Sequence, residues 1–138
     1  MLDALGRMLT FYEELAEQGQ GSPTSQIRVA EALRRMGDLH RSLREYDDAE
    51  ATLLQAITAL EGLIDDMPDE TEPHIQHARA NYTLGRVYRD MGRRDEGDSL
   101  IQFAIVELEA LPSDAPQRRH IQELLSRFRR DAHRVPGE

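Results

Sequence analysis

The chain contains no cysteine, no lysine and no tryptophan. The lack of cysteine excludes disulfides and thiolate metal sites, and it is typical of proteins in a reducing compartment such as the cytoplasm. The lack of lysine excludes a Walker-type phosphate-binding loop, Schiff-base chemistry and a lysine nucleophile. All seventeen basic residues are therefore arginine. We expect a cytoplasmic protein without these chemistries.

Long apolar runs and excess positive charge are absent as well. No run approaches the roughly 18 apolar residues of a membrane-spanning helix, and Met1-Leu2-Asp3 does not begin a signal peptide. The net charge of −9 argues against binding to nucleic acid or to an anionic membrane. A length of 138 residues predicts one domain. The dominance of helix-forming residues over β-branched clusters predicts an all-α fold.

An internal repeat dominates the rest of the sequence. A shift of forty-eight positions carries Gly37 onto Gly85 and aligns residues 25–68 with the following segment without a gap. The identical pairs include Ile27 and Ile75, Ala30 and Ala78, Arg41 and Arg89, Asp47 and Asp95, Ala56 and Ala104, and Pro68 and Pro116. The N-terminal residues fit the same register, so the chain is predicted to consist of repeated helix pairs.

Glycine occurs at helical positions of both repeats. A glycine within a helix costs about 1 kcal/mol relative to alanine, so Gly37, Gly85 and Gly97 require a reason in the packing. Close approach of two antiparallel helices joined by a short turn supplies that reason. Gly92 lies between the two helical patterns of the second repeat, where such a turn is expected.

The order of small and apolar residues resembles the tetratricopeptide repeat. The matching residues are Leu33, Met36, Gly37, His40, Tyr46, Ala49, Leu53 and Ala56, then Asn81, Leu84, Gly85, Tyr88, Arg94, Gly97, Ile101 and Ala104. His40 replaces an aromatic residue, Gly97 replaces an alanine, and the period exceeds the usual length of about 34 residues. The long period is similar to that of arrays attached to bacterial serine/threonine kinases. The resemblance implies an antiparallel, superhelical array of about six helices.

The repeat divides a single domain of residues 1–138 into four parts. Residues 2–18 are predicted to form the second helix of an incomplete repeat, residues 22–67 and 72–111 two helix pairs, and residues 114–134 a closing helix. Polar residues are expected to cap four of the helices. These are Ser22, followed by Pro23, and then Asp47, Asp95 and Ser113.

No residue pattern indicates a catalytic site, because the serines are scattered and none lies in the turn that exposes a nucleophile. We therefore expect no enzyme activity, no cofactor and no bound metal. His74 and His77 lie three positions apart beside Glu72, a spacing that could hold a divalent ion, but ordinary surface histidines are the favoured interpretation. His40 is predicted to be a packed, hydrogen-bonded core residue.

Arginine lines one predicted face of the array. The resemblance places the first helix of each pair along a concave groove that receives partner proteins. The predicted groove residues are Arg34, Arg41, Arg79, Tyr82, Arg86 and Arg89, joined from the closing helix by Arg127, Arg130 and Arg134, or by Arg119 and Arg129 if its register is shifted. A guanidinium binds a carboxylate in a bidentate manner, and the Tyr82 ring offers a flat apolar platform. This face predicts a protein–protein interaction module that binds an acidic or carboxylate-ended segment.

Other interpretations of the same residues stay open. The groove arginines can instead pair with acids of neighbouring second helices. Asp38 and Arg86 stand where the carboxylate clamp of chaperone-binding members has asparagine, so that activity is not implied. The chain could also be a spacer or a self-association module within a larger, kinase-linked protein. Its first helix would then pair either with a second copy or with preceding residues of the larger protein, through an apolar face made of Leu5, Met8, Leu9 and Tyr12.

Overall fold

The computed structural model describes residues 3–4, 6–7, 10–11, 14 and 21–134. Within residues 21–134 the chain forms five helices, and no strand occurs in the part of the chain that is described. They are α2 (Pro23–Ser42), α3 (Tyr46–Asp66), α4 (Thr71–Asp90), α5 (Arg94–Glu109) and α6 (Arg118–Ala132). The predicted all-α helix array is confirmed. The predicted apolar face of residues 5, 8, 9 and 12 lies outside the described residues.

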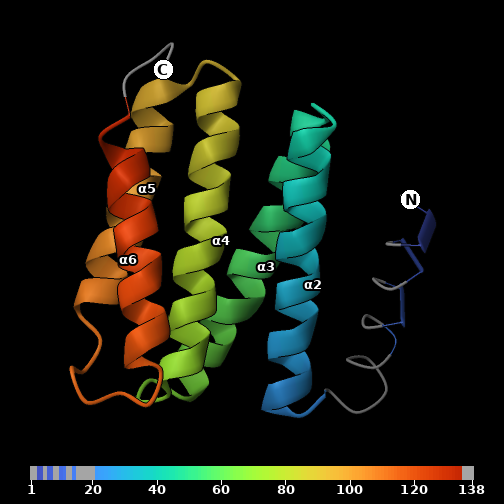
Figure 1. The fold of residues 1–138 in the computed structure, drawn as a ribbon. Helices are drawn as coiled ribbons and strands as arrows, with labels where there is room; N and C mark the ends of the chain where they lie inside the picture. The colour runs from blue at the N-terminus through green and yellow to red at the C-terminus, as the bar shows by residue number, and fades with distance from the viewer. Residues whose placement is uncertain (1–2, 5, 8–9, 12–13, 15–20, 135–138) are drawn as a thin grey trace.

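The five helices form two layers (Figure 1). Helix α2 packs against α3, α4 packs against α5, and α3 packs against α4, so each helix pair contacts the next. The first helices α2 and α4 also touch one another, and α6 lies beside α4 in the same layer while it packs on α5. Helix α6 thus covers the second pair, as a closing helix is predicted to do.

Two apolar clusters share α4 between them. One cluster joins α2, α3 and one side of α4, and its centre is formed by Leu53 and Leu60, which are 0% and 1% exposed. The other joins the opposite side of α4 to α5 and α6 around Ile101 and Phe128. Because α4 is covered from both sides, even several of its polar residues are buried. None of the helices in the described ranges is long and apolar enough to cross a membrane.

The helix crossings contain the predicted glycines. A Cβ atom added to Gly37 would lie 2.6 Å from Cγ of Leu53. A Cβ atom added to Gly85 would lie 2.7 Å from the carbonyl oxygen of Gly97, and one added to Gly97 would lie 2.5 Å from the carbonyl oxygen of Gly85. All three distances are shorter than a real Cβ contact, so the packing reason for these glycines is confirmed.

The predicted cap at Ser22 is also confirmed. Its hydroxyl accepts a hydrogen bond from the Ser25 backbone amide at 3.1 Å, and Pro23 occupies the first helical position. Both features favour a helix start at this point. The hydroxyl accepts from a backbone amide that has no acceptor within the helix, and proline has no backbone N–H that would need an acceptor.

The other three predicted caps are wrong. Asp47 and Asp95 lie in the first turns of α3 and α5, which begin at Tyr46 and Arg94 without a side-chain cap. The reason is a tight turn before each of these helices, closed by hydrogen bonds from the Glu45 amide to the His40 carbonyl and from the Arg93 amide to the Tyr88 carbonyl. Because of these turns, each helix begins earlier than the predicted cap. Ser113 also fails as a cap, since α6 begins only at Arg118. Residues 113–114 and 116–117 form turns instead, and the Ala115 amide donates to the Pro112 carbonyl at 3.2 Å.

Candidate functional site

The predicted arginine stripe lies on α2 and α4, and part of it is paired with carboxylates. Arg41 donates through Nε to Asp90 at 2.7 Å, and Arg89 donates to Asp98 of α5 at 2.7 Å. The Nε atom of Arg86 lies 3.5 Å from an Asp131 oxygen on α6. These three guanidinium groups therefore have anionic partners within the fold. We refer to Arg41, Arg86 and Arg89 as the paired arginines.

Tyr82 belongs to the contact between α4 and α6. Its ring stacks on Phe128, with 4.0 Å between ring centroids and 12° between planes, and its hydroxyl donates a hydrogen bond to Asp131. The residue is only 6% exposed. Burial and the Asp131 hydrogen bond raise the pKa of Tyr82 to about 12. The ring is therefore occupied by Phe128 and does not offer the flat platform that the sequence predicted.

Arg34 is buried without a strong partner. It is 8% exposed, its Nη1 atom lies 3.7 Å from Asp38, and its buried Nε atom has no hydrogen-bond partner among the described residues. Burial and then repulsion from Arg79 lower the pKa of Arg34 to about 10. The positive charge of this guanidinium is thus poorly compensated by the fold.

Arg79 extends the uncompensated charge toward α6. Its Nη1 atom lies 3.4 Å from Nε2 of His120, which is a contact with an imidazole nitrogen and not with a carboxylate. Burial and then the charge of Arg127 lower the pKa of Arg79, and the charge of Arg35 adds to this effect. Within residues 21–134, no carboxylate forms an ion pair with Arg35, Arg79 or Arg127.

Four arginines and one histidine from three helices lie near one another. We refer to this group as the cationic cluster, and its members are Arg34 and Arg35 of α2, Arg79 of α4, and His120 and Arg127 of α6. The acids that partly offset its charge are Glu31, Asp38 and Glu72. Guanidinium groups held in this way can bind a carboxylate with two parallel hydrogen bonds.

Part of this cluster was predicted from the sequence. Arg34, Arg79 and, in the strict register of the closing helix, Arg127 were predicted, whereas Arg35 and His120 were not. Arg129 of the shifted register lies on the other side of α6, where it pairs with Glu109 at 2.7 Å. The strict repeat register was the signal that identified Arg127. No comparable signal existed for His120, because its position depends on how α6 packs against α4.

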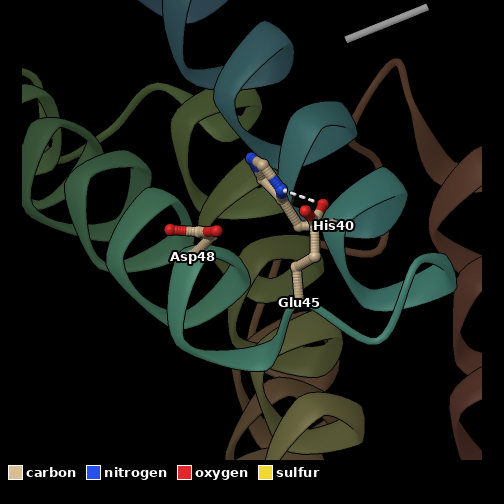
Figure 2. Close-up of side chains that lie close together, drawn as sticks. All are labelled: His40, Glu45 and Asp48. Carbon is tan, nitrogen blue, oxygen red and sulfur yellow. Dashed lines mark hydrogen bonds and ion pairs between the residues drawn. The ribbon is translucent and has the colours of Figure 1, made fainter.

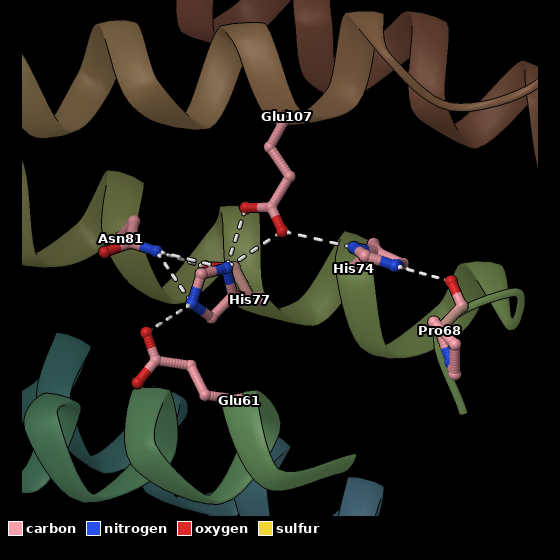
Figure 3. A network of polar contacts seen from close by, with 6 residues as sticks. All are labelled: Glu61, Pro68, His74, His77, Asn81 and Glu107. Atoms are coloured by element: carbon pink, nitrogen blue, oxygen red, sulfur yellow. Dashed lines mark hydrogen bonds and ion pairs between the residues drawn. The ribbon is translucent and has the colours of Figure 1, made fainter. Parts of the chain in front are cut away.

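His77 is the centre of a buried polar network (Figure 3). Its Nδ1 atom lies 2.8 Å from a Glu107 oxygen on α5, and its Nε2 atom lies 3.3 Å from Glu61 on α3. His74 lies 3.5 Å from the same Glu107 carboxylate and 3.1 Å from the Pro68 carbonyl oxygen. His77 is 6% exposed, so the prediction of an ordinary surface histidine is wrong. The reason is that His77 lies on the side of α4 covered by both second helices.

The environment of His77 favours the charged imidazolium. Burial alone lowers the pKa of His77, but the hydrogen bonds and charges of Glu107 and Glu61 together outweigh burial and raise it. Glu72, which the sequence placed beside the two histidines, instead accepts a hydrogen bond from Gln76 at 2.8 Å. The network holds three helices together through charge, with both nitrogens of His77 engaged.

His40 is packed and hydrogen-bonded, as predicted (Figure 2). Its side chain is 15% exposed, and its Nδ1 atom lies 3.1 Å from Glu45. Together with Asp48, these residues place three metal-ligating atoms within 4.8 Å of one another. Of the described residues, no other group of three or more histidine and carboxylate side chains is so close.

An apolar pocket of about 510 Å³ lies in the other layer, between α3 and α5. Its lining includes Leu54, Ile57, Leu84 and Leu100, and Leu54 is 44% exposed. The pocket is separated from the cationic cluster by α4, so the two surfaces can be tested independently.

Comparison with known families identifies the helix pairs. Residues 30–59 and 78–102 match the family model of the tetratricopeptide repeat, and these segments fall on α2 with α3 and on α4 with α5. No curated protein and no solved structure matches the chain. Tetratricopeptide repeats are non-catalytic modules that generally mediate protein–protein interaction. The two matched segments, one on each helix pair, are therefore similar to tetratricopeptide repeats.

Proposed function

We propose that this chain is a protein–protein interaction module that receives an acidic or carboxylate-ended segment of its partner at the cationic cluster. The proposal depends on one observation, the uncompensated charge of Arg34 and Arg79. Arg34 is buried with its Nε atom unpartnered, and Arg79 contacts a histidine rather than an acid. A carboxylate between them would supply the missing acceptor and relieve the repulsion between the two guanidinium groups.

The proposed location is one part of the groove predicted from the sequence, the part that contains Arg34 and Arg79. The paired arginines are engaged by Asp90, Asp98 and Asp131, so a ligand would have to compete with existing ion pairs there. At the cationic cluster the competing ion pair is the longer one between Arg34 and Asp38, at 3.7 Å. The net charge of −9 repels an acidic partner at long range, but screening over about 8–10 Å at physiological salt weakens distant charges more than contacts.

The experiment compares two double variants with the same change in net charge. Arg79→Glu/Arg127→Glu reverses two charges of the cationic cluster, whereas Arg94→Glu/Arg129→Glu reverses the half-buried Arg94 of α5 and the exposed Arg129 of α6. The probe is a fluorescent peptide of ten glutamate and aspartate residues with a free carboxyl end. Its amide-capped and glutamine versions serve as peptide controls, and folding is checked by circular dichroism.

We expect the wild-type chain to bind the acidic peptide with a Kd in the micromolar range, and more weakly as salt rises. The cluster variant should lose at least tenfold in affinity, and the control variant should bind within about twofold of the wild type, because it keeps every member of the cluster. Equal binding by both variants would contradict the proposal. A pull-down with the same three proteins then tests whether natural partners follow the peptide.

The alternative function is a structural spacer that positions attached domains, including those of a kinase-linked parent protein. It is favoured by the paired arginines, which serve the fold itself. A spacer needs no ligand at the cluster, so complete absence of peptide binding would support it. Both functions are compatible with the proposed division of the chain, which is an incomplete repeat at residues 2–18, helix pairs at 22–67 and 72–111, and a closing helix at 114–134. Self-association through the first helix is compatible with both functions as well.

A further inference from the structure

We propose that His40, Glu45 and Asp48 form a binding site for one divalent transition-metal ion of the zinc class. His40 is near the end of α2, Glu45 directly precedes α3, and Asp48 is in the first turn of α3. One donor atom from each lies within 4.8 Å of the others (Figure 2). An imidazole nitrogen with two carboxylate oxygens is a donor set that zinc accepts, with water in the fourth position.

The distances fit a small tetrahedral ion. Zinc bonds of about 2.0–2.2 Å place neighbouring donor atoms roughly 3.3 Å apart. The Nδ1 atom of His40 and the Oε1 atom of Glu45 are already 3.1 Å apart. Asp48 is exposed, so a change of its rotamer can close the remaining distance without disturbing the core. In the metal-free chain the His40–Glu45 contact is a hydrogen bond, so the metal takes the place of its proton.

The second repeat shows what normally occupies this position. The two inter-helix turns have the same backbone hydrogen bonds, for example from the Glu45 amide to the His40 carbonyl and from the Arg93 amide to the Tyr88 carbonyl, both 2.8 Å long. The residues equivalent to His40, Glu45 and Asp48 are Tyr88, Arg93 and Glu96. The backbone frame is therefore shared, and only the side chains differ.

In the second turn the protein supplies its own cation. The Arg93 guanidinium lies 2.7 Å from Glu96, 3.4 Å from Glu50, and 4.1 Å above the centre of the Tyr88 ring. In the first turn a carboxylate, Glu45, stands at the position of that arginine. No arginine of the described residues forms an ion pair with Glu45 or Asp48. The first turn therefore collects two carboxylates and an imidazole where the equivalent turn has a positive charge.

The ordinary role of acids at a helix start does not account for Glu45. Asp48 in the first turn interacts favourably with the helix dipole, which would explain that residue alone. Glu45 occupies the N-cap position, but its side chain makes no capping hydrogen bond and contacts His40 instead. His77 and Glu107 form a different arrangement, in which both ring nitrogens of His77 already have carboxylate partners.

The test titrates zinc chloride into the untagged chain by isothermal calorimetry, with cobalt absorption and the proton resonances of His40 as site-specific readouts. We expect one zinc ion per chain with a Kd in the micromolar range or tighter, a perturbed His40 resonance, and a thermal midpoint that rises with zinc concentration. No binding up to millimolar zinc would overturn the proposal.

Two variants and a control decide whether the site is the one described. Glu45→Arg recreates the arginine of the second turn and should weaken zinc binding at least tenfold while the helical signal is kept. Asp48→Asn provides the same test at an exposed position if Glu45→Arg does not fold. His74→Gln removes a histidine of the other network and should leave binding unchanged. Wild-type affinity in Glu45→Arg or Asp48→Asn, or loss of binding in His74→Gln, would contradict the assignment. None of these variants changes the cationic cluster, so the outcome is independent of the acidic-peptide test.

Discussion

The two helix pairs follow the same path with different residues at the crossing. In the first pair, Gly37 meets the side chain of Leu53. In the second, Gly85 and Gly97 each face the carbonyl oxygen of the other, and the side chains of Ile101 and Arg89 also lie against this crossing. Leu53 and Ile101 occupy equivalent positions, and Ala49 stands where the second pair has Gly97, so one glycine is enough for the crossing of the first pair. A second glycine makes the contact depend on the backbones themselves.

The two pairs also differ in what they bury. Helix α4 of the second pair is covered by α3, α5 and α6, and it holds the His77 network in its interior. The equivalents of His77 and Glu107 in the first pair are Val29 and Ala59, which cannot form such a network. The first pair instead carries the uncompensated groups, Arg34 on α2 and Glu45 at the turn. The buried charge network thus lies in the second repeat, whereas the poorly compensated arginines come from both repeats, Arg34 from α2 and Arg79 from α4.

The largest loss of stability is expected when the packing of α6 on the second helix pair is disrupted. Phe128→Ala removes a ring that is 1% exposed and stacked on Tyr82. The change should lower the free energy of unfolding by about 3–5 kcal/mol, because a large cavity remains between α4 and α6. Phe103→Ala is the matched control, since Phe103 is 55% exposed and should cost less than about 1 kcal/mol. Urea unfolding of both variants measures the difference, and equal losses would show that α6 contributes little.

The next largest loss of stability is expected at the helix crossing that contains Gly85. Gly85→Leu forces a side chain into the Gly97 backbone and should cost about 1–3 kcal/mol. Gly62→Leu is the control, because a Cβ at Gly62 meets no atom within 4 Å and the exchange favours the helix by up to about 1 kcal/mol. Thermal unfolding of the two variants gives the comparison. A neutral shift for Gly85→Leu would remove the packing explanation.

The His77 network should make the stability depend on pH. The folded-state pKa of His77 is raised above its ordinary value of 6.5, so its contribution is fully present below pH 6.5 and is lost as the pH rises through the folded pKa. His77→Gln should remove this slope and cost on the order of 1.5 kcal/mol at pH 6, where the charged hydrogen bonds are lost. Urea midpoints measured between pH 5.5 and 8.5 provide the test. A wild-type curve that rises with pH over this range would contradict the assigned sign.

The smallest effect concerns the two inter-helix turns. Arg44 has φ of 61° and Gly92, its equivalent, has φ of 84°, a region that glycine adopts without steric cost. Arg44→Gly should therefore raise the free energy of unfolding by up to about 1 kcal/mol, and Gly92→Ala should lower it by about 1 kcal/mol. Differential scanning calorimetry of both variants measures the two shifts, and a shift in the same direction for both would contradict this interpretation.

Sequence alone determined the architecture. The repeat, the helical spacing of apolar residues, the glycine crossings and the Ser22 cap are local patterns or simple repetitions of one, and they are set by helix geometry within a few turns. These features were predicted and found at α2 to α5. Helix starts were less accurate at Asp47, Asp95 and Ser113, because several polar residues near each start suit a cap equally well.

Tertiary structure decided the partners of the charged residues. Arg41 meets Asp90, and Arg86 meets Asp131, across distances along the chain that no local pattern encodes. His77 became buried because α3 and α5 both cover its side of α4, and His120 joined Arg79 because α6 packs beside α4. An arginine on a helix face has the same sequence signature whether it binds a ligand or an acid of the next helix. Only the packing of the helices brings the competing carboxylates into reach, and so decides which arginines remain uncompensated.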